Sequence, residues 1–501
     1  MIIRPGTWSL ARQAAASLSR RVTPAMLAAM ALAAIASAAL FVKPFIGMAD
    51  NGDFYRILYG NGLYFSAPDY AGQYFGYFVK GFGILQHYNE HAAAILSSQS
   101  LFIRLAVWLN TLLYSPSTFD IRFQGALYLA LYMGAVYLLV ESVTWQMPRA
   151  RGNMIALLAV LQFGDTGYTA YFHSFYGESV VLIMSVFMAA SGLLLHRRRY
   201  NDYALLALFV ASALLLTTAK QQNAPVGVIA AVVGIALLLL SRTKVFRITA
   251  LTSLLLLLAA GIGVYALIPQ EFVNINQYHA MTRGPLMTSG NPEEALAFFG
   301  IDEQYAILAG GLYYERYPTI DVNSPLLEQG FYSQYGFFSI LRYYLAHPPE
   351  ALDMLRLAAR HAFTIRPEAM GNFELSEGRA FREHTHFFTL YSWFKSRALP
   401  NTFGFIVIWA IVVLGLYTPS FLTAVRAKDY RSALKLPILL MLMLIGLSSM
   451  AVSVIGAGDA DLAKHEFLFT VSFDLVLFVG LADLIRTRSL AIRAFSRRSA
   501  G

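Results

Sequence analysis

The sequence predicts an all-α protein that crosses a membrane many times, with about ten transmembrane helices and a mainly helical extracytoplasmic domain. Three observations predict this fold class: 57% of the 501 residues are hydrophobic, only 13% are charged, and the mean hydropathy is +0.53. A soluble domain carries roughly 25% charged residues, so a soluble enzyme and a disordered chain are both excluded. The apolar runs are continuous and about twenty residues long, which is the length that spans a bilayer as a helix.

Ten apolar stretches are predicted as membrane spans, and the third of them is the shortest. They are residues 24–42, 123–143, 153–165, 178–195, 203–219, 224–241, 248–268, 402–422, 436–455 and 466–485. Residues 1–268 are expected to form a seven-helix membrane module with an outer loop at 43–122. Residues 269–401 are expected to form the extracytoplasmic helical domain, and residues 402–501 a three-helix membrane segment with a basic tail.

The positions of the basic residues predict the orientation in the membrane. Six short segments, on every second connection between spans, hold 21 of the 38 Lys and Arg residues. They are residues 4–21, 149–151, 197–199, 242–247, 426–435 and 486–498. Because basic loops stay on the cytoplasmic side, both termini are expected there and the two large loops on the other side. The net charge of +9 has the same origin, so no nucleic-acid partner is expected.

Helices are also predicted outside the spans. Residues 99–113 carry apolar side chains around most of a helix, so this segment is expected to lie in the membrane interface. Asn291, followed by a proline and two acids, indicates a helix start. Two more helices are expected at 337–346 and 349–363, separated by His347-Pro348-Pro349. In the first span, the motif Ala36-Ser37-Ala38 resembles a signal-peptide cleavage site, but the apolar stretch is long and we expect the helix to be retained.

The first candidate for chemistry is the segment Asp50-Asn51-Gly52-Asp53-Phe54-Tyr55-Arg56, which follows the first span by a few residues. Two acids three residues apart can hold a metal or supply a general base. An Asn-Gly turn with solvated acids is the alternative. Asp53 is preferred over Asp50 as the base, because it lies beyond the glycine hinge. Its aromatic neighbours would desolvate its carboxylate and raise its pKa, while Arg56 would keep it ionised.

Three short outer loops carry acids, amides, Lys and His at the same expected depth as Asp53. Because loops on one side of a bundle converge, these side chains are expected to surround a common cleft. Lys220, Lys464 and Arg382 are candidate ligands for a phosphate, with His465 beside Lys464. A lysine that snorkels at a helix end is the alternative. The candidate substrate-binding residues are Arg56, Asp165, His173, Glu178, Lys220, Gln221, Arg382, Asp459, Asp461, Lys464 and His465.

The layout of the chain resembles the GT-C superfamily of membrane glycosyltransferases over residues 24–401. This layout is an acid just past the first span, then seven spans in all, then a large outer loop with helices. Three strings are similar to membrane hexosyltransferases of bacterial surface-glycan assembly: DNGDFYR at 50–56, HSFYGE at 173–178 and GDADLAKH at 458–465. The resemblance implies a multi-pass protein of a bacterial inner membrane, whose active site faces the periplasm or the exterior.

The resemblance further implies a hexosyltransferase. Such an enzyme moves the sugar from a polyprenyl-phosphate-type lipid to a cell-surface glycan or a lipid-linked acceptor. The acid of the first loop activates the acceptor hydroxyl, a role that falls here on Asp53 or Asp50. Some members bind a divalent cation, Mg²⁺ or Mn²⁺, and some do not. The first loop here lacks the D-x-D pattern, and Asp459-x-Asp461 lies in another loop, so the sequence leaves metal dependence open.

Two other functions stay open at this point. A polysaccharide polymerase or ligase would use the same lipid carriers and cannot be separated by sequence from a monosaccharide transferase. A flippase or transporter of lipid-linked glycans would need repeated halves and polar groups at mid-membrane. The predicted spans are nearly free of charge. Asp474 lies inside the last span, 466–485, and one acid does not make a path for protons. An enzyme at the membrane surface is therefore favoured.

Overall fold

The computed structural model describes residues 22–87, 96–268 and 270–498. In this part of the chain, nine helices are long and apolar enough to cross a membrane. They are α2 (Pro24–Phe41), α5 (Arg122–Thr144), α8 (Glu178–Arg197), α9 (Asp202–Ala219), α10 (Ala224–Val233) continued by the 3₁₀ helix η5 (Gly234–Leu239), α11 (Lys244–Ala266), α19 (Phe403–Arg426), α21 (Lys435–Ala457) and α23 (Phe467–Arg498). The predicted fold class, a helical multi-pass membrane protein, is confirmed.

The third predicted span, at 153–165, is helical but short. It forms helix α6 (Arg149–Phe163), whose 15 residues extend about 22 Å, less than the ~30 Å of the hydrocarbon core. It packs against α2, α5 and α23 within the bundle. Of the ten predicted spans, nine are therefore long enough within the described residues and one is a shorter packed helix. The first basic segment, 4–21, lies outside the described residues.

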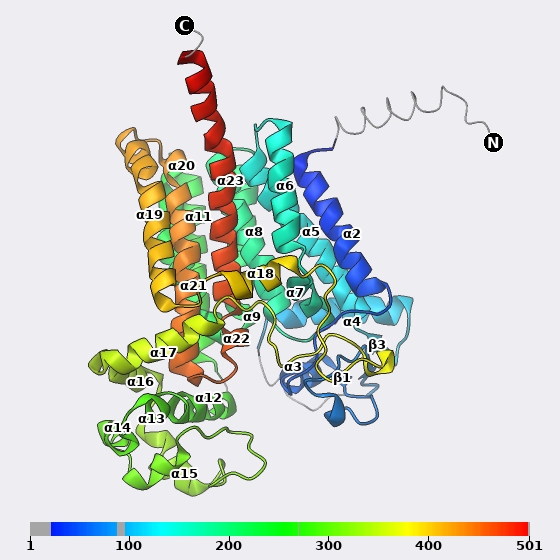
Figure 1. Cartoon of the computed structure of the whole chain (residues 1–501), viewed down its shortest axis with the longest axis vertical. Helices are drawn as coiled ribbons and strands as arrows, with labels where there is room; N and C mark the ends of the chain where they lie inside the picture. Colours follow the sequence, from blue (N-terminus) through cyan, green and yellow to red (C-terminus); the bar gives the residue numbers. More distant parts are fainter. Residues whose placement is uncertain (1–21, 88–95, 269, 499–501) are drawn as a thin grey trace, which may run out of the picture.

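The long helices stand side by side, and α2 begins at the end of the bundle where α23 ends (Figure 1). Helix α8 is the centre of the bundle, because nearly all its side chains are buried and it packs against α5, α9, α21 and α23. Helix α19 buries few side chains, among them Ile406 and Val413. An apolar helix that is exposed on most faces is suited to lipid, so α19 lies at the edge of the bundle.

The opposite end of the bundle carries the small elements, and we call it the loop end (Figure 1). Three strands pair antiparallel there in the order β1-β2-β3. They are β1 (Leu63–Tyr64), β2 (Gly81–Ile84) and β3 (Thr118–Asp120). The sequence does not predict this sheet, because such short strands carry no recognisable alternation of apolar and polar residues. Three short helices lie at the same end: α3 (Tyr55–Leu58), α7 (Thr166–Thr169) and α22 (Leu462–His465). A fourth short helix, α20 (Tyr430–Ala433), lies at the other end of the bundle, between α19 and α21.

The helix predicted for the membrane interface forms as α4 (Gln99–Leu113). Its polar anchor is Asn110, whose amide donates hydrogen bonds to the carbonyl oxygens of Ser115 and Thr118, at 2.9 and 2.8 Å. The exposed face is apolar: Leu101, Leu105, Trp108, Leu112 and Leu113. A helix whose polar groups are held by the protein and whose apolar face is open supports a position in the interface.

Between α11 and α19 the chain forms seven more α-helices. They are α12 (Gln270–Thr282), α13 (Pro285–Thr288), α14 (Pro292–Phe299), α15 (Pro325–Gly330), α16 (Phe337–Ala346), α17 (Pro348–His361) and α18 (Leu390–Ala398). Helix α16 has the predicted bounds, and α17 begins one residue before the predicted start. Asn291 is the residue before α14, as predicted, but its side chain makes no capping hydrogen bond.

The apolar side chains of this segment belong to two cores. Those of residues 278–363 form a core of their own together with side chains of α21 and α23, centred on residues such as Phe331, Tyr343 and Phe363. Those of residues 365–391 pack instead into the core of the main bundle. The second part is thereby held against the membrane helices, while the first forms the layer that covers the loop end.

An ion pair lies buried inside the bundle. The ammonium nitrogen of Lys395 lies 2.6 Å from the carboxylate of Asp474 in α23, and the two side chains are 1% and 0% exposed. The hydroxyls of Tyr168 and Tyr391 also donate to Asp474, at 2.5 and 2.7 Å. A carboxylate inside an apolar helix needs such partners, because its surroundings cannot solvate it. Asp474 therefore has a structural role that ties α18 to α23.

We expect Lys395→Met to lower the unfolding temperature of the detergent-solubilised protein. The variant leaves Asp474 buried without its cation, and breaking a buried pair in this way costs about 3–5 kcal/mol. The double variant Lys395→Met, Asp474→Asn is the matched control, and it should recover most of the loss because no uncompensated charge remains. Equal unfolding temperatures for the parent and Lys395→Met would show that the pair does not stabilise the fold.

Candidate functional site

Lys464 lies at the centre of a cluster of ion pairs at the loop end of the bundle. It belongs to α22 and is only 5% exposed. Its ammonium nitrogen forms ion pairs with the carboxylate of Asp53 and, at 2.9 Å, with that of Asp461. The ring of Tyr176 lies 5.3 Å from the same nitrogen. Arg56 binds the other oxygen of Asp53 at 3.1 Å, so Asp53 lies between two cations.

Asp53 is held in place by a tight turn after the first span. Gly52 has a φ of +99°, a conformation that residues with a side chain rarely adopt. Asp50 accepts hydrogen bonds from the backbone N–H groups of Gly52 and Phe54, at 2.7 and 3.2 Å. Its second oxygen accepts one from the Tyr70 hydroxyl at 3.2 Å. Asp50 is thus buried and stabilises the turn, whereas the Asp53 side chain is 27% exposed and can be reached by a substrate.

Lys464 is held in place by the loop that follows α21. Gly458 has a φ of +59°, and a Cβ added there would lie 2.5 Å from the carbonyl oxygen of Arg283 in the segment after α12. Arg283 also donates to both carboxylate oxygens of Asp459, at 2.5 and 3.0 Å. Asn51 donates to Asp461 at 3.0 Å. These contacts fix the loop against both large outer segments of the chain.

The cluster keeps its members charged. Burial alone would raise the pKa of Asp53, but Lys464 and Arg56 outweigh burial and hold that pKa well below its usual range. Burial likewise opposes the charge of Lys464, yet Asp461 and Asp53 raise its pKa. The expectation that aromatic neighbours raise the pKa of Asp53 is therefore wrong. The reason is a cation 411 residues away in the sequence, whose contact no local pattern reveals.

Asp50 behaves in the opposite way. Burial raises its pKa to about 6, against the effect of the hydrogen bonds that it accepts from Gly52 and Phe54. The carboxylates of Asp50 and Asp53 therefore titrate in different pH ranges although they are three residues apart. Such a difference in pKa allows two acids in one site to have different roles. At pH 7 Asp53 is ionised in the cluster, while Asp50 is about one pH unit above its pKa and is mostly ionised as well.

A second ion pair borders the cluster. Lys220, which follows α9, lies 2.7 Å from Glu178, the first residue of α8, and the Glu178 side chain is 1% exposed. The two predicted substrate-binding residues therefore bind each other. Glu178 also contributes to the raised pKa of Lys464, so the two sets of ion pairs belong to one network.

The hydrogen bonds of His465 indicate which of its nitrogens carries the proton. The side-chain amide of Gln222 donates to the carbonyl oxygen of His465 at 3.0 Å, so the amide oxygen faces Nδ1 at 2.7 Å. Nδ1 is therefore the donor and Nε2 the acceptor. Burial, with the charges of Lys464 and Lys220, lowers the pKa of His465 well below its usual value. The ring is neutral, so His465 adds no positive charge to the cluster.

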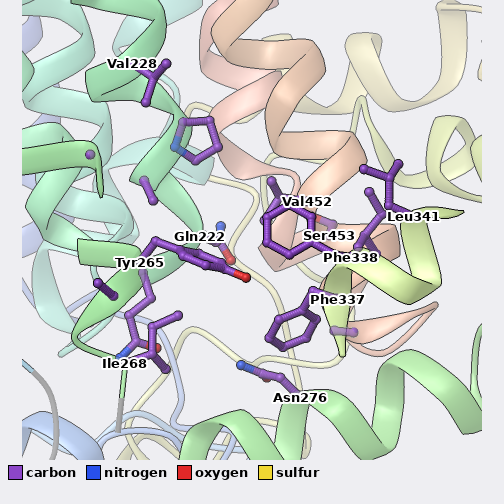
Figure 2. A pocket seen from close by; sticks show the side chains of 18 of the residues that line it. Gln222, Val228, Tyr265, Ile268, Asn276, Phe337, Phe338, Leu341, Val452 and Ser453 are labelled. Atoms are coloured by element: carbon purple, nitrogen blue, oxygen red, sulfur yellow. The ribbon is translucent and has the colours of Figure 1, made fainter. Parts of the chain in front are cut away.

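An apolar cavity of about 550 Å³ lies beside the cluster, with His465 in its wall. Figure 2 shows it between α10, α11, α12, α16 and α21. Its lining includes Val228, Ile268, Leu341 and Val452, with Gln222 and Asn276 as polar members. Tyr265 and Phe338 in the lining are 46% and 74% exposed, so the cavity is open to the outside of the bundle. Because Lys464 precedes His465, the cluster adjoins this cavity.

The structure places two predicted site residues in the packed interior instead. Asp165 accepts hydrogen bonds from the backbone N–H groups of Gly167 and Ser392, both at 2.8 Å, and so joins α7 to α18. His173 is 1% exposed, its ring packs against Phe41 and Phe78, and its Nδ1 lies 2.9 Å from the Ile46 carbonyl oxygen. Both residues therefore have structural partners of their own.

The remaining predicted residues lie around the cluster. Gln221 lines the cavity, and Asp459 is bound by Arg283. Arg382 lies over the rings of Phe75 and Phe381, at 5.3 and 5.4 Å, on the outer surface of the loop end. The backbone N–H of Phe75 donates to the Asp50 carbonyl oxygen at 2.7 Å, so Phe75 connects Arg382 to the turn that carries Asp53.

The predicted site leaves out four residues of the cluster and its surroundings: Asn51, Tyr176, Gln222 and Arg283. Asn51 and Tyr176 lie within strings that the sequence singles out, but no contact with the ion pairs is predicted for them. The Tyr176 hydroxyl accepts from the Asn51 backbone N–H at 2.7 Å. Gln222 adjoins a predicted residue. Arg283 has no signal in the sequence, because its partner Asp459 is 176 residues away.

The acids of the cluster do not form a site for a divalent cation. Asp53 and Asp461, the two carboxylates that approach each other, share the ammonium group of Lys464 between them. Asp459 is occupied by Arg283. Across residues 22–87, 96–268 and 270–498, no group of three or more His, Cys, Asp or Glu side chains could hold a metal ion. Because the carboxylates of the cluster are already paired with cations of the chain, they do not fit the Mg²⁺ or Mn²⁺ that the sequence left open.

Comparisons with known proteins give two findings. A family model described as the YfdI N-terminal transmembrane domain matches residues 12–500. Among solved structures, the archaeal oligosaccharyltransferase AglB from Archaeoglobus fulgidus, in complex with an inhibitory peptide and a dolichol-phosphate, matches with 13% identity and a TM-score of 0.34. The match covers 93% of this chain and 51% of that one, so this chain spans about half its length, and no argument about activity follows. Curated proteins give no match.

We expect Asp50→Asn to flatten the pH dependence of stability. Because the folded-state pKa of about 6 exceeds the ordinary 3.8, the folded protein holds this proton more tightly than the unfolded chain does. The contribution to stability is therefore full at low pH and is lost as the pH rises from about 4 through 6. Asparagine keeps an acceptor for the turn and does not titrate.

The measurement is the unfolding temperature between about pH 4 and pH 8, compared for parent and variant. Asp353→Asn is the control, because that side chain is 59% exposed on α17. An Asp50→Asn profile as steep as that of the parent would show that Asp50 is not the group that titrates.

Proposed function

The chain belongs to the family of the YfdI N-terminal transmembrane domain, and from this premise we propose that it is a membrane glycosyltransferase. It takes a sugar, expected to be a hexose, from a polyprenyl-phosphate-type donor and transfers it to a cell-surface glycan or a lipid-linked acceptor. One observation carries the proposal: the ion pair of Asp53 and Lys464 adjoins an apolar cavity at the loop end of the bundle. A base, a cation for phosphate and a pocket for a lipid chain are then neighbours.

The cavity supports a lipid-linked donor. Its volume of about 550 Å³ lies within the ~300–1,000 Å³ typical of ligand pockets, and its walls are almost entirely apolar. An isoprenoid chain can bury its methylene and methyl groups there, which is favourable by about 25 cal/mol per Å². The donor phosphate then lies at the cluster, where Lys464 and Lys220 are the cations closest to the cavity wall formed by His465.

The reaction assigns one task to each side of the ion pair. The acceptor hydroxyl oxygen attacks the anomeric carbon of the donor sugar, and its proton passes to the carboxylate of Asp53. The bond between that carbon and the phosphate oxygen breaks, and its electron pair leaves with the phosphate. Lys464 stabilises the negative charge that the leaving phosphate gains. Asp50 acts through the turn, as the residue that positions Asp53.

The ion pair of Asp53 and Lys464 also couples the binding of the donor phosphate to the removal of the acceptor proton. A carboxylate whose pKa is held well below its usual range is a weak base. When the donor phosphate draws Lys464 toward itself, Asp53 loses one of its two cations and its pKa rises. Donor binding therefore activates the base. Without a donor, Asp53 stays paired with Lys464 and is too weak a base to take a proton from the acceptor.

The loop end is proposed to be the extracytoplasmic face, since the connections with basic residues at 149–151, 197–199, 242–247 and 426–435 lie at the other end of the bundle. The rival function, transport of a lipid-linked glycan, draws no support from the charged pair inside the bundle. Lys395 and Asp474 are fully buried and bound to each other, as in a structural pair. A polymerase or ligase would use the same site, and the length of the glycan added in the assay separates these from a transferase of single sugars.

We expect Asp53→Asn to abolish transfer while leaving donor binding intact. Loss of general-base help lowers the rate about 10²–10⁴-fold. The measurement is sugar transfer by the reconstituted protein from polyprenyl-phosphate sugar, with binding of undecaprenyl phosphate as a second readout. Binding should be equal or tighter, because Asp53 no longer competes for Lys464. Asp50→Asn is the matched control and should keep most of the activity. Full activity of Asp53→Asn would refute the proposed base.

We expect Lys464→Ala to weaken the binding of undecaprenyl phosphate. A hydrogen bond to a charged group is worth about 1.5–3 kcal/mol, which is roughly 10- to 150-fold in affinity. Lys464→Arg should restore binding only in part, since a planar guanidinium does not replace a point charge between two carboxylates. Lys428→Ala, an exposed lysine at the other end of the bundle, serves as the control. Unchanged affinity in Lys464→Ala would place the phosphate elsewhere.

A further inference from the structure

Two tyrosines from distant parts of the chain meet beside Asp53. The hydroxyl oxygens of Tyr55, which begins α3, and Tyr314 lie 3.3 Å apart. Tyr314 is nevertheless 63% exposed, so the pair presents aromatic surface to the outside. The guanidinium of Arg56 lies 5.9 Å from the centre of the Tyr55 ring. Arg56 also binds Asp53, so a single side chain, that of Arg56, lies between the Tyr55 ring and the proposed base.

The loop that carries Tyr314 is held in place by its neighbours. Arg283 donates to the Gly310 carbonyl oxygen at 2.8 Å, and the backbone N–H of Leu312 donates to Glu315 at 2.8 Å. The backbone N–H of Tyr313 donates to Nε2 of His279 at 2.9 Å. Exposed aromatic side chains on an anchored backbone lose little conformational entropy when they bind a ligand.

The anchoring joins this loop to the ion-pair cluster. Arg283 holds the Gly310 carbonyl with one guanidinium nitrogen and binds Asp459 with the others. Asp459 begins the loop that leads to Asp461 and Lys464. One side chain therefore joins the loop that carries Tyr314 to the loop that carries Lys464.

We propose that Tyr55, Arg56 and Tyr314 form the subsite for a sugar ring of the acceptor. The inference rests on the proposed function and names the side of Asp53 from which the acceptor enters. The C–H face of a pyranose packs on an aromatic ring. Its hydroxyls accept hydrogen bonds from the guanidinium and can both donate to and accept from the phenol groups. The contacts run from the cavity through His465, Lys464 and Asp53 to this subsite, so donor and acceptor meet at the carboxylate from different sides.

The charges of the subsite agree with a neutral, hydroxyl-bearing ligand. Burial and the hydrogen bond with Tyr55 raise the pKa of Tyr314, and Arg56 opposes this effect, so the phenol stays protonated and can donate. Arg56 is already neutralised by Asp53. An anionic acceptor group would find no surplus positive charge from these three residues.

The test measures donor and acceptor dependence separately. Transfer by the reconstituted protein is followed with a polyprenyl-phosphate sugar as donor and the glycan and lipid extract of a strain lacking this gene as acceptor. Tyr314→Ala should raise the half-saturating amount of extract about tenfold, because it removes the stacking surface. Its affinity for undecaprenyl phosphate should stay within about twofold of the parent. Tyr314→Phe keeps the ring and should have a smaller effect on the extract dependence.

Tyr317→Ala is the matched control, since that tyrosine is 83% exposed three residues along the same segment. It should leave the dependence on extract unchanged. An unchanged dependence in Tyr314→Ala, with a parent that transfers sugar, would overturn the subsite and leave the proposed function standing. An equal loss of affinity for undecaprenyl phosphate would also overturn it, since Tyr314 would then act on the donor. A parent that transfers no sugar would overturn both proposals.

Discussion

The contact between Lys464 and Asp53 is the interaction on which the site depends. It joins the first outer loop to the loop before the last span, and the ammonium group of Lys464 would be a costly buried charge without its carboxylates. Arg56 on one side and Asp461 on the other complete its neutralisation. The free energy of the cluster therefore depends on all these loops keeping their positions together, which the tight turns at Gly52 and Gly458 permit.

The same contact gives the site its proposed order of events. An ion pair that satisfies both partners suits a resting state, because neither group is left to attract the wrong ligand or to bind a proton. A phosphate that arrives from the cavity competes for the ammonium group. The carboxylate released in this way is then the base, so the network need not rearrange its backbone to become active. Arg283 connects this cluster to the proposed acceptor subsite, since it binds Asp459 in the loop of Lys464 and the Gly310 carbonyl oxygen in the loop of Tyr314.

The bundle explains why these charges gather at one end. Within the membrane helices a charge must find its partner nearby, as Lys395 and Asp474 do with two tyrosine hydroxyls. At the loop end, by contrast, water and short polar loops allow charged side chains to lie close to an apolar cavity. An amphipathic donor, with a lipid chain and a phosphate, needs both surroundings within the length of one molecule.

The sequence by itself determined the class of fold, the spans and several outer helices, because hydropathy and helix-ending residues act over a few neighbours. It also named Asp53, Lys464 and Asp461 as candidates from their loops. Only the tertiary structure decided how they pair, that Asp165 and His173 are structural, and that Arg283 and Tyr314 adjoin the cluster. The physical reason is distance along the chain: the pKa of Asp53 is set by a lysine 411 residues away, and a contact between loops that far apart leaves no local pattern.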